Sequence, residues 1–176
     1  MPEKTHMGSV NLELDEDSEW TAHSVEFPGC TWWAPTKEEA IRLAPGEVSA
    51  FISWLRSQGE EGLPETTASF EVLEEGFGRW TSDSYFADYT FGSDLRLPSR
   101  SEIERSLRWL GYSRRDLVEL THHLDQASLQ LLTGPPGKVR TSEAMLEHIA
   151  DVEWWYLHNL RMLEGARPPP SPERQG

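Results

Sequence analysis

His148 is the residue of this sequence that could most readily hold a metal ion. A turn of about 100° per residue places it at the margin of the apolar face of a predicted helix. A catalytic metal takes about three protein ligands, so one imidazole is not enough. Further ligands would have to come from Asp151, Glu147, His122 or His123, or from a second subunit. The interpretation that the sequence favours is a half-buried histidine that forms a hydrogen bond with a neighbouring residue.

Arg114 falls within the apolar stripe of its predicted helix, where an unpaired charge is costly. Glu153 and Asp151 lie beside the apolar face of the next predicted helix. We therefore predict an ion pair that joins the two helices, either Arg114–Glu153 or Arg114–Asp151. Its expected role is packing and register rather than catalysis.

Three consecutive aromatic residues, Trp154, Trp155 and Tyr156, are too many for one buried stripe of a helix. We therefore predict that at least one of Trp154 and Trp155 contacts a protein partner or the first half of the chain. An aromatic pocket for a small ligand is the alternative.

The rest of the sequence offers little catalytic chemistry. Cys30 is the single cysteine, which excludes an internal disulfide and a cysteine-rich metal site. No lysine, arginine or histidine lies near it in sequence to lower its pKa, so we do not expect a nucleophile. No glycine-rich phosphate loop and no Ser-His-Asp pattern is present.

The elements that would position these residues predict an α+β fold. Residues 8–75 read as an α/β domain with a small, three- to four-stranded antiparallel sheet. Its strands are expected at 10–14, 20–27, 31–34 and 70–74. Thr36 and Glu39 have capping-box spacing and start a helix, which Pro45 is expected to end near residue 43. A second helix is expected over 47–57, with Gly59 as its stop.

The second half of the chain is predicted to be helical. Residues 76–98 read as an aromatic-rich linker, and 99–165 as an antiparallel amphipathic helix pair. Ser99 caps the first helix, which is expected to reach residue 132, and Thr141 caps the second. The apolar positions of the first helix are Ile103, Leu107, Leu110, Leu117 and Leu124; those of the second are Met145, Ile149, Val152, Tyr156, Leu160 and Leu163. Residues 166–176 are expected to be a disordered tail.

The charge is strongly negative, with 30 acidic against 16 basic residues and a formal net charge of −14. Residues 1–98 hold 19 of the acidic residues and 6 of the basic ones. Such a surface repels phosphate backbones, so we expect no nucleic-acid binding and instead a basic protein as partner, or simply a solubilising surface. The sequence has no apolar run of membrane-spanning length and no secretory signal, so a cytoplasmic location without membrane contact is expected.

Residues 12–59 resemble the HicB-like antitoxin fold. The likeness rests on the F-P-G-C turn at 27–30 and on T-K-E-E-A at 36–40, which opens the helix. The resemblance implies a β-β-β-α-β unit, and members of that family often neutralise a small basic RNA-cleaving toxin. Many members also add a C-terminal DNA-binding segment, which we do not find in this sequence.

Residues 103–163 resemble half of the DinB-like helical family. S-R-R-D-L at 113–117 and E-H-I-A-D-V-E-W-W-Y-L at 147–157 carry the likeness. It implies a four-helix bundle in which three histidines hold a divalent metal such as zinc, nickel or iron. His148 matches one of them, whereas the His-x-x-x-His pair of a later helix is not in this sequence.

The sequence therefore predicts a non-catalytic binding or assembly protein that pairs with a second copy or with a protein partner. Two helix pairs from two copies would restore a four-helix bundle. A DinB-type metal-dependent transferase or hydrolase that uses His148 is one alternative. An antitoxin-like partner of a basic toxin is the other.

Overall fold

The computed structural model of the chain describes residues 6–15, 18–65, 67–80, 86–87, 89–133 and 140–159. The chain divides into two compact units, Met1–Arg115 and Asp116–Gly176, and each is described by itself. The predicted tail and the predicted apolar positions Leu160 and Leu163 lie outside the described residues. The α+β class is confirmed.

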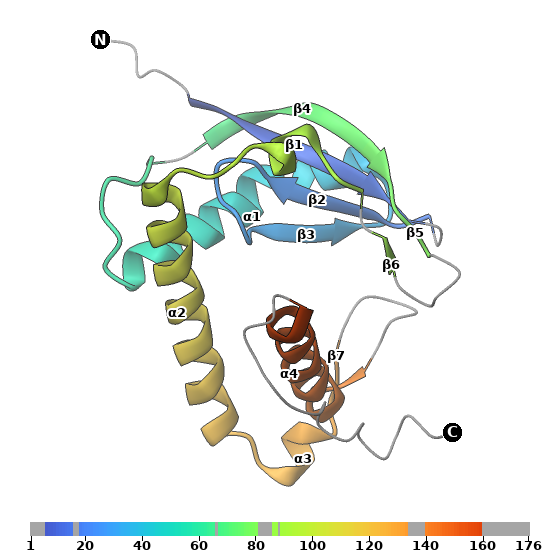
Figure 1. Cartoon of the computed structure of the whole chain (residues 1–176), viewed down its shortest axis with the longest axis vertical. Coiled ribbons are helices and arrows are strands. Elements are labelled where there is room, and N and C mark those ends of the chain that lie inside the picture. Colours follow the sequence, from blue (N-terminus) through green and yellow to red (C-terminus); the bar gives the residue numbers. More distant parts are fainter. Residues whose placement is uncertain are drawn as a thin grey trace. The chain divides into compact units, whose positions relative to one another are not determined.

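The first unit is built on a four-stranded sheet with the order β3-β2-β1-β4 (Figure 1). Its strands are β1 (His6–Leu14), β2 (Trp20–Ser24), β3 (Thr31–Ala34) and β4 (Thr67–Phe77). The first three form an antiparallel meander, but β4 runs parallel to β1. The sheet is therefore mixed rather than antiparallel. A helix connects β3 at one edge of the sheet to β4 at the other edge, beside β1, and a crossover of this kind joins parallel strands.

That connection is one continuous helix, α1 (Lys37–Ser57), which lies against one face of the sheet (Figure 1). The predicted break at Pro45 is wrong. Thr36 does cap the helix, since its side chain accepts from the backbone N–H of Glu39 at 3.2 Å. The buried positions fall on both sides of Pro45: Ala40, Ala44, Val48, Ile52 and Leu55. Burial of this whole stripe offsets the loss of one backbone hydrogen bond at Pro45.

The core of the first unit lies between α1 and this face of the sheet. Val10, Leu12 and Ala22 are fully buried on the strands, in register across β1 and β2. Trp32 of β3 packs with them, and its indole N–H donates to the carbonyl of Ala40 at 2.8 Å. This bond ties the start of α1 to the edge strand β3.

Between β4 and the next long helix, the structure has short elements in the segment that was predicted as a linker. They are β5 (Arg79–Trp80), β6 (Phe86–Ala87) and the 3-10 turn η1 (Gly92–Leu95). β5 and β6 pair with each other.

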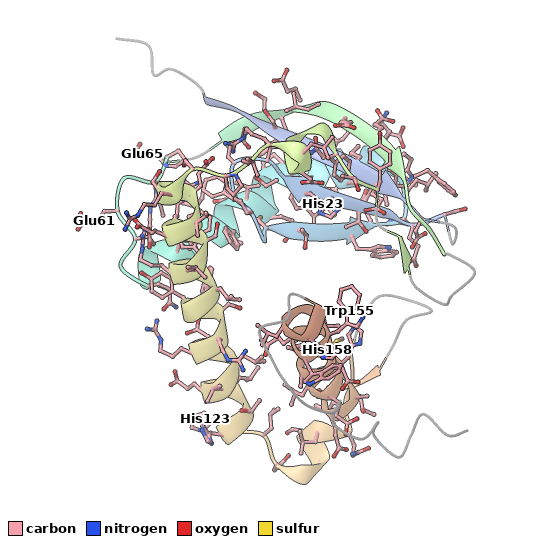
Figure 2. The ribbon with its side chains drawn as sticks, viewed as in Figure 1. His23, Glu61, Glu65, His123, Trp155 and His158 are labelled. Carbon is pink, nitrogen blue, oxygen red and sulfur yellow. The ribbon has the colours of Figure 1, made fainter. Side chains whose placement is uncertain are left out.

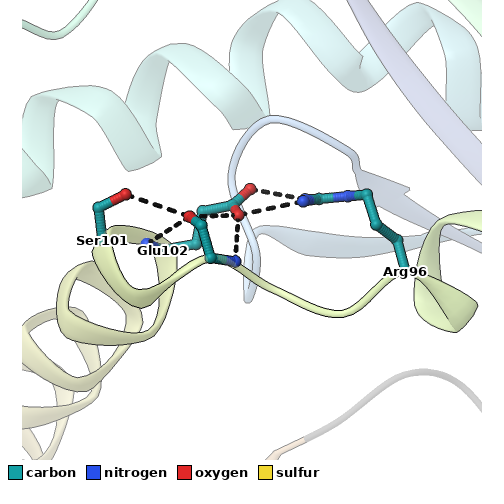
Figure 3. A network of polar contacts seen from close by, with 4 residues as sticks. Arg96, Ser101 and Glu102 are labelled. Carbon is teal, nitrogen blue, oxygen red and sulfur yellow. Dashed lines mark hydrogen bonds and ion pairs between the residues drawn. The ribbon is translucent and has the colours of Figure 1, made fainter.

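The long helix α2 (Arg100–His122) begins at the predicted cap. The hydroxyl of Ser99 accepts from the N–H of Glu102, and the Glu102 carboxylate accepts in return from the N–H of Ser99 at 2.7 Å (Figure 3). Arg96 also donates to this carboxylate. The helix ends at His122 and not near residue 132, because Asp125 caps a new short helix by accepting from the N–H of Ser128 at 2.7 Å.

The second unit contains the end of α2 and four further elements. They are the short helix α3 (Gln126–Leu129), the paired strands β7 (Leu132–Thr133) and β8 (Arg140–Thr141), and α4 (Ser142–Asn159). The predicted cap of α4 is confirmed, since the Thr141 hydroxyl accepts from the N–H of Ala144 at 3.1 Å. Among the described residues, no helix has both the length and the apolar character that a membrane crossing requires.

Candidate functional site

Trp109 anchors α2 to the first unit. It lies about 200° around the helix from Leu107, and it is 4 % exposed. Its ring stacks with Phe27 at a centroid distance of 6.2 Å and meets Phe51 edge-on at 5.9 Å. Residues 100–115 of α2 are therefore held against the sheet unit by one large aromatic side chain.

A carboxylate just after the end of α1 also holds α2 in place. Gly59 takes a positive φ of 89°, which ends α1 and lets the N–H of Glu60 bond back to the carbonyl of Leu55 at 3.1 Å. The Glu60 carboxylate then accepts from Arg108 Nε at 3.0 Å and from the Tyr112 hydroxyl at 3.1 Å. The hydrogen bond from Arg108 is the main cause that lowers the pKa of Glu60. Glu60 thus binds α2 at the residue before the buried Trp109 and again about one helical turn after it.

The consequence is that α2 turns its leucine face outward. Ile103, Leu107 and Leu110 are 45 %, 62 % and 59 % exposed, and we call these three residues the α2 stripe. The sequence predicts them as apolar positions of a helix that packs on the first half of the chain or on another copy. Trp109 fits the core between Phe27 and Phe51, and Arg108 reaches Glu60, so the opposite face of the helix packs instead.

A polar cleft on the other face of the sheet is a second candidate. It has a volume of about 450 Å³ and is lined by Asn11, Glu13 and His23 of the sheet and by Phe91 of the segment before η1, among others. His23 Nε2 lies 3.7 Å from a Glu13 oxygen, and its ring lies 5.6 Å from that of Phe91. A histidine beside a buried carboxylate could transfer a proton. Figure 2 shows His23 on the sheet.

The polar groups of this cleft also hold the segment 89–95 on the sheet. Glu13 accepts from the N–H of Tyr89 at 3.0 Å, and the Asn11 amide donates to the Ser93 hydroxyl at 3.1 Å. The Tyr89 ring lies over Gly76 of β4, where a Cβ atom would overlap it. Glu13 was not singled out in the sequence, although it alternates with Leu12 and so had to face away from α1. Its role is best explained by these contacts, which are structural.

The predicted metal ligands lie on two helices. His148 is exposed and Asp151 is half-buried on α4, and His122 is exposed at the end of α2. Figure 2 shows the neighbouring His123 at that end of α2, and His158 on α4. Within the part of the chain that the structure describes, no group of three or more His, Cys, Asp or Glu side chains is placed to hold a metal ion.

The other predicted site residues have the following positions. Trp155 is 40 % exposed on α4, whereas Trp154 is half-buried and its ring stacks on that of His158 at 4.7 Å. Arg114 belongs to the first unit and Glu153 to the second, so the predicted ion pair stays a prediction. Cys30 is buried, and its burial, followed by the charge of Glu47, raises the pKa of its thiol to about 12. That thiol is not a nucleophile at neutral pH.

A scan against protein-family models, a search of curated proteins and a search of solved structures each find no match to this chain. The resemblances to the HicB-like and DinB-like families therefore stay predictions from sequence. The candidate that the geometry brings forward is the α2 stripe, because it is a row of large apolar side chains on a helix whose opposite face is anchored.

Proposed function

We propose that this protein is a non-catalytic binding and assembly protein, and that a second copy of the chain binds to the α2 stripe. The observation that carries the proposal is the exposure of Ile103, Leu107 and Leu110 on an anchored helix. Contiguous exposed apolar residues mark surfaces that bind other proteins. The helix backbone is already fixed by Trp109 and Glu60, so little conformational entropy is lost when the stripe is covered.

A second copy is the occupant that the form of the α2 stripe supports. Antiparallel pairing about a two-fold axis near Leu107 and Leu110 covers both stripes at once, as a symmetric dimer requires. Glu104 forms an ion pair with Arg100 on its own helix, and both ends of α2 carry acidic as well as basic residues. Burial of the apolar side chains, rather than charge, therefore drives the pairing.

The test is the substitution Leu107→Glu in the full chain. A carboxylate in the centre of the paired stripes would have to lose its hydration, and it occurs twice in a symmetric dimer. We expect the unchanged chain to have the mass of two copies and the variant to dissociate at concentrations at least about tenfold higher, a change of about 1.4 kcal/mol or more. Light scattering after size-exclusion chromatography measures both masses.

Ser101→Glu is the matched control. It adds the same charge to an exposed position of α2 about 120° away from Leu107, in the first turn, where acidic residues are well tolerated. We expect it to keep the mass of two copies. A monomeric unchanged chain at all concentrations would overturn the proposal. So would a Leu107→Glu variant whose dimer is as stable as that of the Ser101→Glu control.

A further inference from the structure

An aromatic groove lies on the first unit beside the α2 stripe. It has a volume of about 200 Å³ and is lined by Pro28, Phe51, Trp54, Trp109 and Leu110, with Ser106 and Ser113 as its polar side chains. We call it the Trp109 groove. Its walls come from the turn after β2, from α1 and from α2, and all of these residues belong to the same compact unit. The groove is therefore complete within one described unit.

The aromatic rings of the groove are tilted relative to one another rather than coplanar. Phe51 meets Trp54 at a centroid distance of 5.3 Å and 49°, and it meets Trp109 edge-on at 5.9 Å. Phe51 and Trp54 are half-buried, whereas Trp109 is buried. The core packing around Phe27 fixes these rings in place before any ligand binds.

Grooves lined by aromatic side chains are suited to proline-rich peptides in the polyproline II conformation. Proline rings are rigid and apolar, so they fit between indole and phenyl rings and lose little entropy on binding. The side chains that line the Trp109 groove are apolar apart from two serine hydroxyls, which matches a ligand of this class.

Acidic side chains lie next to the groove. Trp109 also lines a neighbouring cleft, together with the acidic residues Glu26, Glu60 and Glu61 and the basic residues Arg105 and Arg108. Arg108 is paired with Glu60, and the Arg105 guanidinium lies over the Trp109 ring at 5.2 Å. Glu61 is exposed on the loop after α1 (Figure 2). A proline-rich ligand with a basic residue at one end could pair with this carboxylate.

This chain itself contains a segment of that chemistry. Residues 167–174 read R-P-P-P-S-P-E-R, which places a proline triplet between two arginines. We propose that the Trp109 groove binds this proline-rich segment of a second copy of the chain. The prolines cover the rings of Phe51 and Trp54, and a flanking arginine pairs with Glu61. This inference does not depend on the pairing of the α2 stripes, because the two surfaces share only Leu110.

The probe is a fluorescent peptide with the sequence of residues 165–176, and the readout is its fluorescence anisotropy. The protein is the full chain with Leu107→Glu, which removes pairing through the stripe, and with Pro168→Ala, Pro169→Ala and Pro170→Ala, which stop its own tail from competing. We expect saturable binding of the peptide, and at least about tenfold weaker binding of a peptide with the three prolines replaced by alanine. Because this protein already carries Leu107→Glu, the measurement gives the same result whether or not the α2 stripes of the unchanged chain pair.

Two groove variants locate the binding. Leu110→Ala removes an exposed wall, and Trp54→Leu removes a ring but keeps an apolar side chain against the core. Each is expected to weaken peptide binding at least about threefold, whereas Ile103→Ala, on the stripe but outside the groove, changes it less than about twofold. Circular dichroism checks that each variant is folded.

The proposal is overturned by any of three results. They are no saturation at protein concentrations up to about 1 mM, equal binding of the proline and alanine peptides, and equal binding by the groove variants and Ile103→Ala. Binding that needs the prolines and is lost in both groove variants supports it.

Discussion

At the residue scale, Glu60 connects two helices that are far apart in sequence. Its partner Arg108 is 48 positions away, and the backbone turn at Gly59 aims the carboxylate at α2. The Glu60 side chain is 10 % exposed, whereas that of Arg108 is 52 % exposed. Only the carboxylate of the ion pair is therefore shielded from solvent. Screening by water at Arg108 reduces the strength of the pair.

This geometry predicts the pH dependence of a Glu60→Gln variant. The pKa of Glu60 is lowered in the folded state, chiefly by the hydrogen bond from Arg108, so folding favours the ionised form. Its contribution to stability is therefore complete above the pKa of the unfolded chain, about 4.3, and is lost as the pH falls through the folded pKa. We expect the substitution to lower the free energy of unfolding by about 1 kcal/mol at pH 7.

Urea unfolding at pH 7 and at several values below 4.3 measures this difference. It should shrink on acidification, because the wild-type carboxyl then also becomes neutral. Glu61→Gln is the control, since it removes the same charge from an exposed neighbour on the same loop. A loss equal to that of the control, or one that does not change with pH, would contradict the role given to Glu60.

At the scale of elements, α1 is unusual because it contains a proline in its interior. Pro45 has no N–H to donate to the carbonyl of Ile41, four residues earlier. The helix continues through it because the buried residues Ala40 and Ala44 before it, and Val48 and Ile52 after it, contact the same face of the sheet. Packing of the whole stripe therefore prevails over the local preference at one position.

Pro45→Ala is predicted to stabilise the protein. The substitution restores one helical hydrogen bond and removes a ring clash, effects worth about 3 kcal/mol, of which about 1 kcal/mol is offset by the greater freedom of the unfolded chain. We expect the free energy of unfolding to rise by about 2 kcal/mol, measured by urea unfolding.

Pro35→Ala serves as the comparison, since Pro35 is exposed and precedes the helix. It should lower the stability slightly, through the unfolded state alone. If Pro45→Ala changed the stability no more favourably than Pro35→Ala, a helix that is continuous through residue 45 would be excluded.

At the scale of the whole molecule, the proposed pairing has to overcome charge repulsion. Each copy has a net charge of −14, so two copies repel each other at long range while their apolar stripes attract at contact. Added salt screens the repulsion more than it affects apolar burial, and it should therefore strengthen the pairing.

The pairing also predicts a melting temperature that depends on protein concentration. Binding between folded copies stabilises them by mass action, so a tenfold rise in concentration adds up to about 1.4 kcal/mol. For a chain of this length we expect the melting temperature to rise by about 2–4 °C per tenfold increase. Scanning calorimetry across a hundredfold concentration range measures it, and the Leu107→Glu variant should show no such rise. A flat result for the unchanged chain would contradict pairing.

Several features of the fold could be predicted from sequence because their causes are local. The caps at Thr36, Ser99 and Thr141 depend on hydrogen bonds between residues three apart, so spacing alone indicates them. The strands show as period-two alternation, and Gly59 as a helix stop. The candidate site was less predictable. The apolar spacing of Ile103, Leu107 and Leu110 was visible in the sequence, but not which face of α2 the core would accept.

The sequence by itself thus determined the four strands of the main sheet and the starts of α1, α2 and α4, because capping and periodicity act over a few residues. Only the tertiary structure decided that β4 runs parallel to β1, that α1 passes through Pro45, and that α2 packs by Trp109. Each of these outcomes depends on contacts between residues far apart in the chain, such as Trp109 with Phe27. Such contacts outweigh local preferences because they bury far more apolar surface than any single turn of a helix can.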